Sequence, residues 1–282
     1  MQLYPLLFQP VFKDYLWGGR RLEKFGRELP AGKQIAESWE IAAHQDGMTL
    51  IENGIYAGRS LKSLLDLLGV DLVGTNNQWA LDLGKFPLLV KLLDSHQKLS
   101  VQVHPGDDYA REHENGELGK TEMWVVLDAS PGAAIIYGLS QKTSREDLRR
   151  AIETGNLKAL LHQVPVQQGD HICVPSGTLH AILEGAVIAE IQQNSNVTYR
   201  VFDWNRVNDD GQPRTLHVDR ALDVINYEQV ASALPDPQIL KENPAFIQQR
   251  LCQNSYFTVE RLMWMKDGVY SGQCDGASLE IW

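Results

Sequence analysis

The chain has 282 residues, of which 43% are hydrophobic and 22% charged, and its formal net charge is −10. These proportions exclude a fibrous or largely disordered chain. The sequence has no apolar run of the ~20 residues that a membrane-spanning helix needs, no basic region typical of a secretory signal, and no basic stripe typical of a nucleic-acid binder. It therefore predicts a cytoplasmic protein that binds neither membranes nor nucleic acids.

The three cysteines are widely spaced along the chain. Cys173, Cys252 and Cys274 form neither a CxxC pair nor a recognisable disulfide framework, and their number is odd. We therefore expect each of them to be a small buried hydrophobic residue. This expectation agrees with a reducing cytoplasm.

Turn residues and short apolar segments alternate near the N-terminus. The segments WGG at 17–19 and LPAGK at 29–33 predict loops. A helix is expected from Ser60 to Leu68, because Ser60 is a suitable N-cap and leucines follow it at helical spacing. Gly69 comes next and is a typical residue for ending a helix.

From Phe86 onward the pattern becomes that of an all-β protein. Short apolar or alternating segments are separated by Gly, Pro, Asp or Asn, a rhythm typical of an antiparallel sandwich or barrel. Two helices are expected to interrupt it, over 144–155 with Ser144 as N-cap and over 217–225. A Pro-rich stretch at 234–246 then precedes two further strand-like segments.

The most distinctive local pattern is GDHICVPSGTLH, at 169–180. It predicts a strand, a tight Pro-Gly turn and a histidine, His180, at the start of the next strand, so the turn determines where that histidine points. The pattern resembles the second signature motif of the cupin superfamily, whose fold is a double-stranded β-helix, or jelly roll. Glu184 stands where that superfamily usually has an asparagine.

Two earlier segments contain further residues suited to binding a metal ion. Side chains two apart on a strand share a face, so Gln102 and His104 of LSVQVHP can be directed at one ion. Lys120 and Glu122 of GKTEMW share a face for the same reason. The two histidines and the glutamate, with Gln102 as a fourth ligand, suit Zn²⁺ or Fe²⁺ with a position left for substrate.

The order of these and other motifs resembles the type I mannose-6-phosphate isomerase family. The motifs are WGG, ESWE at 37–40, PLLVKLLD at 87–94, QVHP, GKTEMW, VPSGTLHA and EIQQNSNVTYRVFDW. The resemblance extends over nearly the whole chain. It implies a zinc-dependent aldose–ketose isomerase that interconverts mannose 6-phosphate and fructose 6-phosphate through an enediolate.

The same resemblance implies roles for particular residues. The implied ligands of one Zn²⁺ per chain are Gln102, His104, Glu122 and His180. The implied catalytic residues are Arg200, Lys120 and Glu190, and the sequence leaves the choice between Lys120 and Glu190 as the base undecided. The implied substrate-binding residues are Lys91, Ser100 and Arg206.

Glu190 and Arg200 flank a predicted turn at 194–196. We expect a hairpin there, which would bring both side chains to one mouth of the barrel. Because the chain carries a net charge of −10, it would repel an anionic sugar phosphate unless cations such as Arg200 line the pocket.

The predicted fold is mostly β, with a cupin jelly-roll core, peripheral helices and a partial second jelly roll. We expect a zinc-binding catalytic domain over 1–233, a linker over 234–246 and a truncated β domain over 247–282. Its exposed sheet edge would suit pairing with a second copy. Two alternatives stay under consideration, namely another metal-dependent cupin enzyme such as an Fe²⁺ dioxygenase, and a non-catalytic sugar-binding cupin.

Overall fold

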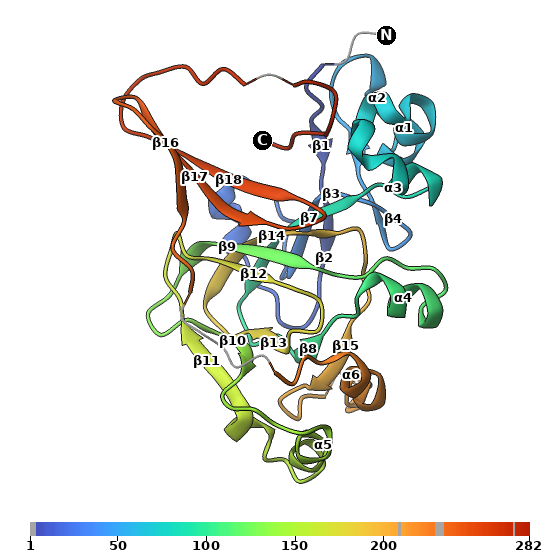
Figure 1. The fold of residues 1–282 in the computed structure, drawn as a ribbon, viewed down its shortest axis with the longest axis vertical. Helices are drawn as coiled ribbons and strands as arrows, with labels where there is room; N and C mark the ends of the chain where they lie inside the picture. The colour runs from blue at the N-terminus through green and yellow to red at the C-terminus, as the bar shows by residue number, and fades with distance from the viewer. Residues whose placement is uncertain (1–3, 208–209, 229–233, 273) are drawn as a thin grey trace.

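Two large antiparallel sheets make up the body of the protein (Figure 1). The computed structural model describes residues 4–207, 210–228, 234–272 and 274–282. The larger sheet has the strand order β12-β9-β14-β7-β3-β2. In chain order its strands are β2 (Val11–Lys13), β3 (Glu37–Ile41), β7 (Leu88–Ser95), β9 (Glu122–Ala129), β12 (His171–Val174) and β14 (Ala186–Gln193).

The second large sheet has five strands in the order β11-β10-β13-β8-β15. These strands are β8 (Val101–Val103), β10 (Ala134–Leu139), β11 (Leu161–Pro165), β13 (His180–Ile182) and β15 (Tyr199–Phe202). Two two-stranded sheets, β1-β6 and β4-β5, and a three-stranded sheet contain the remaining strands, namely β1 (Phe8–Gln9), β4 (Ala43–His44), β5 (Gly47–Met48), β6 (Leu50–Ile51), β16 (Gln238–Glu242), β17 (Phe246–Gln253) and β18 (Thr258–Trp264).

The apolar core between the two large sheets draws on both of them. Trp124 of β9 and Ile188 of β14 come from the six-stranded sheet, whereas Ile135 of β10 and Ile182 of β13 come from the five-stranded sheet, and all four are buried in one cluster. Strands that alternate between an inward and an outward face produce this kind of sandwich. The prediction of a mostly β, jelly-roll-like fold is confirmed.

Helices surround this β core (Figure 1). Figure 1 shows α1, α2 and α3 together at one end of the molecule and α5 and α6 at the opposite end. The helices are α1 (Leu61–Leu68), α2 (Val70–Val73), α3 (Gln78–Asp82), α4 (Asp107–His113), α5 (Arg145–Glu153) and α6 (Val218–Val224). Short 3₁₀ turns cover Arg21–Phe25, Gly54–Tyr56, Thr75–Asn77 and Leu157–Leu160.

The three helices predicted from the sequence are all present. Ser60 caps α1 by accepting a hydrogen bond from Ser63 N, and Ser144 caps α5 in the same way from Asp147 N. Gly69 ends α1 with a φ of 50°, a conformation that favours glycine. These ends agree with the prediction because capping depends on local sequence.

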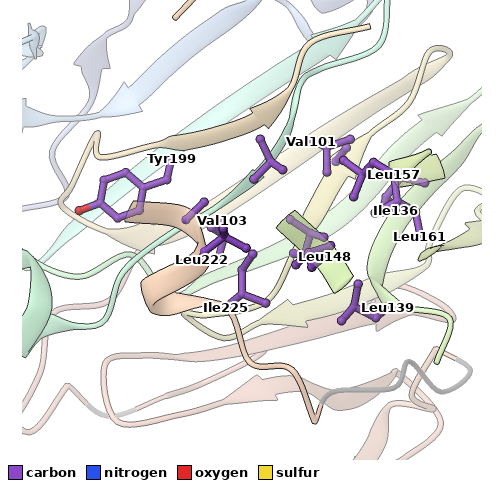
Figure 2. Packing of buried hydrophobic residues seen from close by; sticks show 14 of the residues in the cluster. Val101, Val103, Ile136, Leu139, Leu148, Leu157, Leu161, Tyr199, Leu222 and Ile225 are labelled. Atoms are coloured by element: carbon purple, nitrogen blue, oxygen red, sulfur yellow. The ribbon is translucent and has the colours of Figure 1, made fainter. Parts of the chain in front are cut away.

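Helices α5 and α6 cover the outer face of the five-stranded sheet (Figure 2). Leu148 of α5 and Leu222 of α6 are fully buried there, in one cluster with Val101 and Val103 of β8. Because Val101 and Val103 point outward toward the helices, the residue between them, Gln102, points to the inner face of the sheet.

Leu148→Ala should lower the free energy of unfolding by ~2–5 kcal/mol, because it leaves a cavity under α5. Urea denaturation monitored by circular dichroism measures this loss. Leu67→Ala is the matched control, since Leu67 is also a helical leucine but is 46% exposed. Equal losses in the two variants would contradict the described packing.

The three-stranded sheet packs near the outer face of the six-stranded sheet. Leu251 of β17 and Phe257 are buried in one cluster with Met123 of β9. Strands β16 and β18 are the edges of this sheet, and pairing of an edge with a second copy stays a prediction. The division of the chain into domains likewise stays a prediction.

One local difference concerns the predicted linker. Residues Gln238–Glu242 of that stretch form β16, which pairs antiparallel with β17. The strand lies between Pro237 and Pro244, in a segment without proline whose backbone N–H groups can all pair. The proline content of the whole stretch concealed this short strand.

The expectation for the cysteines is wrong. Cys173 of β12 and Cys252 of β17 form a disulfide with a Cα–Cα distance of 6.0 Å, and Cys274 is exposed. The paired residues are 79 positions apart, so only the packing of β17 on β12 brings them together. The cysteines therefore no longer support a cytoplasmic location, which stays a prediction.

Among the described residues, no helix has both the length and the apolar character needed to cross a bilayer.

Candidate active site

Three side chains with metal-binding atoms converge between the two large sheets. His104 follows β8, Glu122 begins β9 and His180 begins β13. Their donor atoms lie within 4.8 Å of one another, and all three residues are buried. His104 Nε2 lies 3.3 Å from Glu122 Oε1, and His180 Nε2 lies 3.6 Å from Glu122 Oε2. The structure therefore brings together the two histidines and the carboxylate that the sequence predicted as ligands.

Backbone carbonyls orient both imidazole rings. His104 Nδ1 lies 2.7 Å from the carbonyl oxygen of Val197, and His180 Nδ1 lies 2.8 Å from that of Thr178. A carbonyl oxygen only accepts hydrogen bonds, so each Nδ1 carries the proton and each Nε2 presents a lone pair toward Glu122. His180 Nε2 and both Glu122 oxygens are buried and have no hydrogen-bond partner among the described residues. These atoms fit a metal cation.

The protonation states also suit a metal. Burial lowers the pKa of His104 to about 3, with a further contribution from the Lys120 charge. Burial likewise lowers the pKa of His180. Burial alone would raise the pKa of Glu122, but Lys120 and His104 hold it well below its ordinary value. At neutral pH the site therefore holds two neutral imidazoles and one carboxylate, the forms that bind a metal ion.

Lys120 lies beside this group of donor atoms. Its Nζ is 2.6 Å from Glu122 Oε1, an ion-pair distance, and 3.2 Å from His104 Nε2. Lys120 itself is buried. The shared face predicted for Lys120 and Glu122 is thus present in the structure.

Gln102 connects the metal-binding side chains to Arg200. In the five-stranded sheet Gln102 pairs with His180 on one side and with Arg200 on the other. Ser100 Oγ donates to Gln102 Oε1 at 3.2 Å and accepts from Arg200 Nε at 3.3 Å. The structure therefore places three predicted site residues, Ser100, Gln102 and Arg200, in one hydrogen-bonded chain.

A second buried cluster surrounds Lys91. Its Nζ lies 3.3 Å from Glu190 Oε2 and 3.6 Å from Glu37 Oε2. The Trp39 ring is also 5.0 Å from this Nζ, a cation–π distance. Burial would lower the pKa of Lys91, but Glu37 and Glu190 raise it above its ordinary value. Lys91 is therefore a fixed positive charge in the interior.

Trp124 joins the Lys91 cluster to the histidines. Its Nε1 donates to Glu190 Oε1 at 3.0 Å, and its ring meets the His180 ring edge-on at a centroid distance of 5.4 Å. Burial, followed by the negative charge of Glu122, raises the pKa of Glu190. Glu190 is therefore a carboxyl whose proton is held more tightly than usual.

The hairpin predicted between Glu190 and Arg200 is wrong. Strand β14, which contains Glu190, lies in the middle of the six-stranded sheet, whereas β15, which contains Arg200, is an edge of the other sheet. The turn residues Asn194–Asn196 therefore cross from one sheet to the other. Glu190 bonds to Trp124, and Arg200 bonds to Ser100 and to the carbonyl oxygen of Thr215.

Several residues around the site were missed by sequence reasoning. Arg206, a predicted substrate-binding residue, donates to the Asp203 carboxylate at 2.6 Å, and Arg214 donates to the same carboxylate. Glu37 and Trp39, which belong to the Lys91 cluster, lie two residues apart on one strand, and this spacing was a usable signal for their shared face. The other partners come from distant positions and left no local signal, namely Trp124, Asp203 and Arg214.

Without bound metal, the protein should lose stability as the pH falls below about 6.5, the ordinary pKa of histidine. The folded state keeps His104 neutral down to a pKa of about 3, so below pH 6.5 only the unfolded state takes up this proton. Between pH 7 and pH 5 the free energy of unfolding should fall by about 2 kcal/mol more in the wild type than in His104→Gln.

Urea denaturation of chelator-treated protein at the two pH values measures this difference. His113→Gln is the control, because the His113 side chain is 42% exposed and should keep the pH dependence of the wild type. The same pH dependence in His104→Gln and the wild type would show that burial of His104 has no effect on stability.

Comparison with known proteins agrees with this geometry. Residues 6–125 match the family model for the catalytic domain of type I phosphomannose isomerase. The chain is 42% identical over 261 residues to the probable mannose-6-phosphate isomerase GmuF of Bacillus subtilis, covering 91% of this chain and 78% of the relative. It is 45% identical over 232 residues to the mannose-6-phosphate isomerase of Streptococcus mutans, covering 82% of this chain and 71% of the relative.

Solved structures show the same relationship. The mannose 6-phosphate isomerase of Bacillus subtilis superimposes with a TM-score of 0.82 at 36% identity, covering 92% of this chain and 80% of that one. A zinc-bound mannose 6-phosphate isomerase superimposes with a TM-score of 0.64 at 16% identity, covering 88% of this chain and 80% of that one, and so shares the fold. The resemblance inferred from the motifs is confirmed, and the chain belongs to the type I phosphomannose isomerase family.

Proposed function

We propose that this protein interconverts mannose 6-phosphate and fructose 6-phosphate with one zinc ion bound by His104, Glu122, His180 and Gln102. The observation that carries the proposal is the convergence of two Nε2 lone pairs and a carboxylate in a buried site of a type I phosphomannose isomerase chain. Two imidazoles and a carboxylate are a common ligand set for catalytic zinc.

The reaction moves a proton between C1 and C2 of the sugar, and negative charge develops on oxygen. When bound, zinc supplies a Lewis acid that stabilises this charge. The residues of the chain bind the sugar, exclude water and carry the proton. Ser100 contributes by forming hydrogen bonds to both Gln102 and Arg200, which positions these two side chains along one edge of the site.

Lys120 and Glu190 are the two proposed carriers of the proton. Lys120 Nζ lies against the metal-binding atoms, 2.6 Å from Glu122 Oε1. Glu190 is held by Trp124, and its raised pKa brings a carboxyl closer to neutral pH, where acid–base catalysts are most effective. A group that gives and takes a proton must be able to adopt both its protonated and its deprotonated form. Glu190→Gln and Lys120→Met should therefore be compared in the same assay.

The cations of the site offset the overall negative charge of the chain. Arg200, at the edge of the five-stranded sheet, is proposed to attract and orient the sugar phosphate, and Lys91 of the six-stranded sheet, whose charge Glu37 and Glu190 balance, is proposed to orient the substrate through its N–H donors. A guanidinium presents a fork of donors that matches phosphate or enediolate oxygens. Without such local cations, a chain with a net charge of −10 would repel this substrate.

A coupled assay with mannose 6-phosphate, run before and after chelation, tests the proposal. We expect turnover to disappear on metal removal and to return when Zn²⁺ is added to one equivalent per chain. Parallel reconstitution with Fe²⁺ tests the dioxygenase alternative, which predicts oxygen consumption in place of isomerisation. Turnover that persists after complete metal removal would contradict the proposed mechanism, and no turnover at any metal content would favour a sugar-binding protein.

A further inference from the structure

One aspartate joins the two chain segments that contain the proposed ligands His104 and Glu122. Asp107 begins α4, three residues after His104. Its Oδ1 accepts a hydrogen bond at 2.8 Å from the backbone N–H of Gly119, which lies three residues before Glu122. The connection between β8 and β9 is therefore closed at its base, next to the metal-binding side chains.

The two segments approach each other very closely at Gly119. A side chain at this position would place its Cβ 2.5 Å from Asp107 N, a distance at which only glycine fits. Beside this contact, Lys120 N donates to the carbonyl oxygen of Pro105 at 3.0 Å. The backbone of Lys120 is therefore fixed to the segment that follows His104, and its Nζ lies 3.2 Å from His104 Nε2.

A buried glutamine at the end of β14 binds to the same aspartate. Gln193 Nε2 donates to Asp107 Oδ1 at 2.9 Å, and Gln193 Oε1 accepts from Thr121 N at 2.9 Å. Thr121 is the residue between Lys120 and Glu122, and its carbonyl oxygen accepts from Gln193 N. Each backbone N–H from residue 119 to residue 121 is thus held by a hydrogen bond, and Asp107 takes part in this network through two donors.

The other oxygen of this carboxylate is bound from the three-stranded sheet. Tyr256, in the turn between β17 and β18, donates its hydroxyl to Asp107 Oδ2 at 2.7 Å. Burial, and then this hydrogen bond, raise the pKa of Tyr256 to about 12, so the phenol keeps its proton at neutral pH. The disulfide between Cys173 and Cys252 attaches the same sheet to β12. The three-stranded sheet therefore contacts the connection that leads to Glu122.

We propose that Asp107 and Tyr256 are positioning residues for the segment that enters β9. This segment contains Lys120 and Glu122, so the inference rests on the proposed function, which gives these two residues their roles. Asp107 acts through the backbone at 119–121, and Tyr256 acts through Asp107. A small displacement of a ligand or a proton carrier is enough to lower both metal affinity and turnover. The three-stranded sheet thereby takes part in organising the active site.

Asp107→Ala tests the positioning role of the aspartate. We expect the Kd for Zn²⁺ to rise by ~10-fold or more and kcat to fall by a similar factor, the effect of losing a partner that orients metal ligands. KM should change less, because Arg200 lies on another strand. Asp107→Asn should recover most of both losses, since its Oδ1 accepts the same two hydrogen bonds and its Nδ2 can donate to the Tyr256 hydroxyl. Asp108→Ala is the matched control, since Asp108 is the next residue of α4 but its side chain is 95% exposed.

Tyr256→Phe tests the contribution of the three-stranded sheet. The Kd for Zn²⁺ and kcat should change in the same direction as in Asp107→Ala but by a smaller factor, because Asp107 keeps its other hydrogen bonds. In the double variant the two effects should not add, since Tyr256 acts through Asp107. Tyr270→Phe is the control, because Tyr270 belongs to the same C-terminal region and packs its ring against Phe246. Additive effects would overturn the role given to Tyr256.

A purely structural role of Asp107 has a different signature. It would lower the urea midpoint of Asp107→Ala and leave the Kd for Zn²⁺ and kcat of the folded variant as in the wild type. That result, in protein shown to be folded by circular dichroism, would overturn the proposal. If Asp107→Ala does not fold, Tyr256→Phe decides, because it removes a single hydroxyl. Wild-type values of both constants in Tyr256→Phe would then overturn the proposal.

The positioning role and the proposed function fail in distinguishable ways. Competition with a chelator of known affinity measures zinc binding without requiring turnover. If the metal-loaded wild type fails to isomerise but Asp107→Ala binds Zn²⁺ more weakly, the proposed function is wrong and the positioning role stands. If the wild type isomerises and Asp107→Ala behaves identically in both measurements, the positioning role is wrong and the proposed function stands.

Discussion

Replacing Glu122 by glutamine is expected to remove most of the bound metal and to lower turnover by ~10³-fold, since metal-ion catalysis supplies several kcal/mol of transition-state stabilisation. Glu122 is the carboxylate that faces both His104 Nε2 and His180 Nε2. The amide has the same shape but no negative charge, so it binds a divalent cation weakly. It also leaves the positive charge of Lys120 without its nearest partner.

Metal analysis and the coupled assay measure the two effects on the same preparation. Glu117→Gln is a suitable control, because Glu117 lies five residues before Glu122, in the connection between β8 and β9, but pairs with Lys85, 3.2 Å away. The control should keep one metal per chain and nearly full turnover. A Glu122→Gln protein that retains both its metal and its activity would remove Glu122 from the proposed ligand set.

Replacing Arg200 by alanine is expected to lower turnover by ~10²-fold or more, the scale of losing one preorganised donor to developing negative charge. Arg200 lies on β15 opposite Gln102 and is hydrogen-bonded to Ser100. Because the Arg200 side chain bonds to Ser100 and to the carbonyl oxygen of Thr215, and its link to the predicted ligand Gln102 runs through Ser100 and the strand backbone, the zinc content should be unchanged. Arg200→Lys should restore little, since lysine keeps the charge but not the two-pronged contact.

The KM and kcat of each Arg200 variant separate binding of the substrate from stabilisation of the transition state. Arg250→Ala is the control, because Arg250 is also a strand arginine but pairs with Glu260 in the three-stranded sheet. It should leave both constants unchanged. Near-normal turnover in Arg200→Ala would show that Arg200 has no part in catalysis.

Local sequence was sufficient for the parts of the site that depend on neighbouring residues. The Pro-Gly turn before His180 and the two-residue spacing of Lys120 and Glu122 both predicted side-chain directions that the structure contains. Strand alternation and helix capping operate over a few residues, so they can be recognised in a single sequence. The ends of α1 and α5 were predicted for the same reason.

Tertiary structure decided which sheet each strand joins. Glu190 and Arg200 are ten residues apart, yet their strands lie in different sheets, because the intervening segment crosses between sheets and does not form a hairpin. A turn leaves the same signal in the sequence whether the chain forms a hairpin or crosses to another sheet, so the sequence alone could not distinguish these two arrangements. The pairing of Cys173 with Cys252 likewise depends on where β17 packs.

The sequence by itself determined the mostly β fold, the family and the residues with metal-binding chemistry. Only the tertiary structure decided how the buried charges are compensated. Lys91 lies between Glu37 and Glu190, and Asp203 holds Arg206 and Arg214. Burying a charge is costly unless an opposite charge or a hydrogen bond meets it, and that partner can come from any part of the chain that the fold brings close.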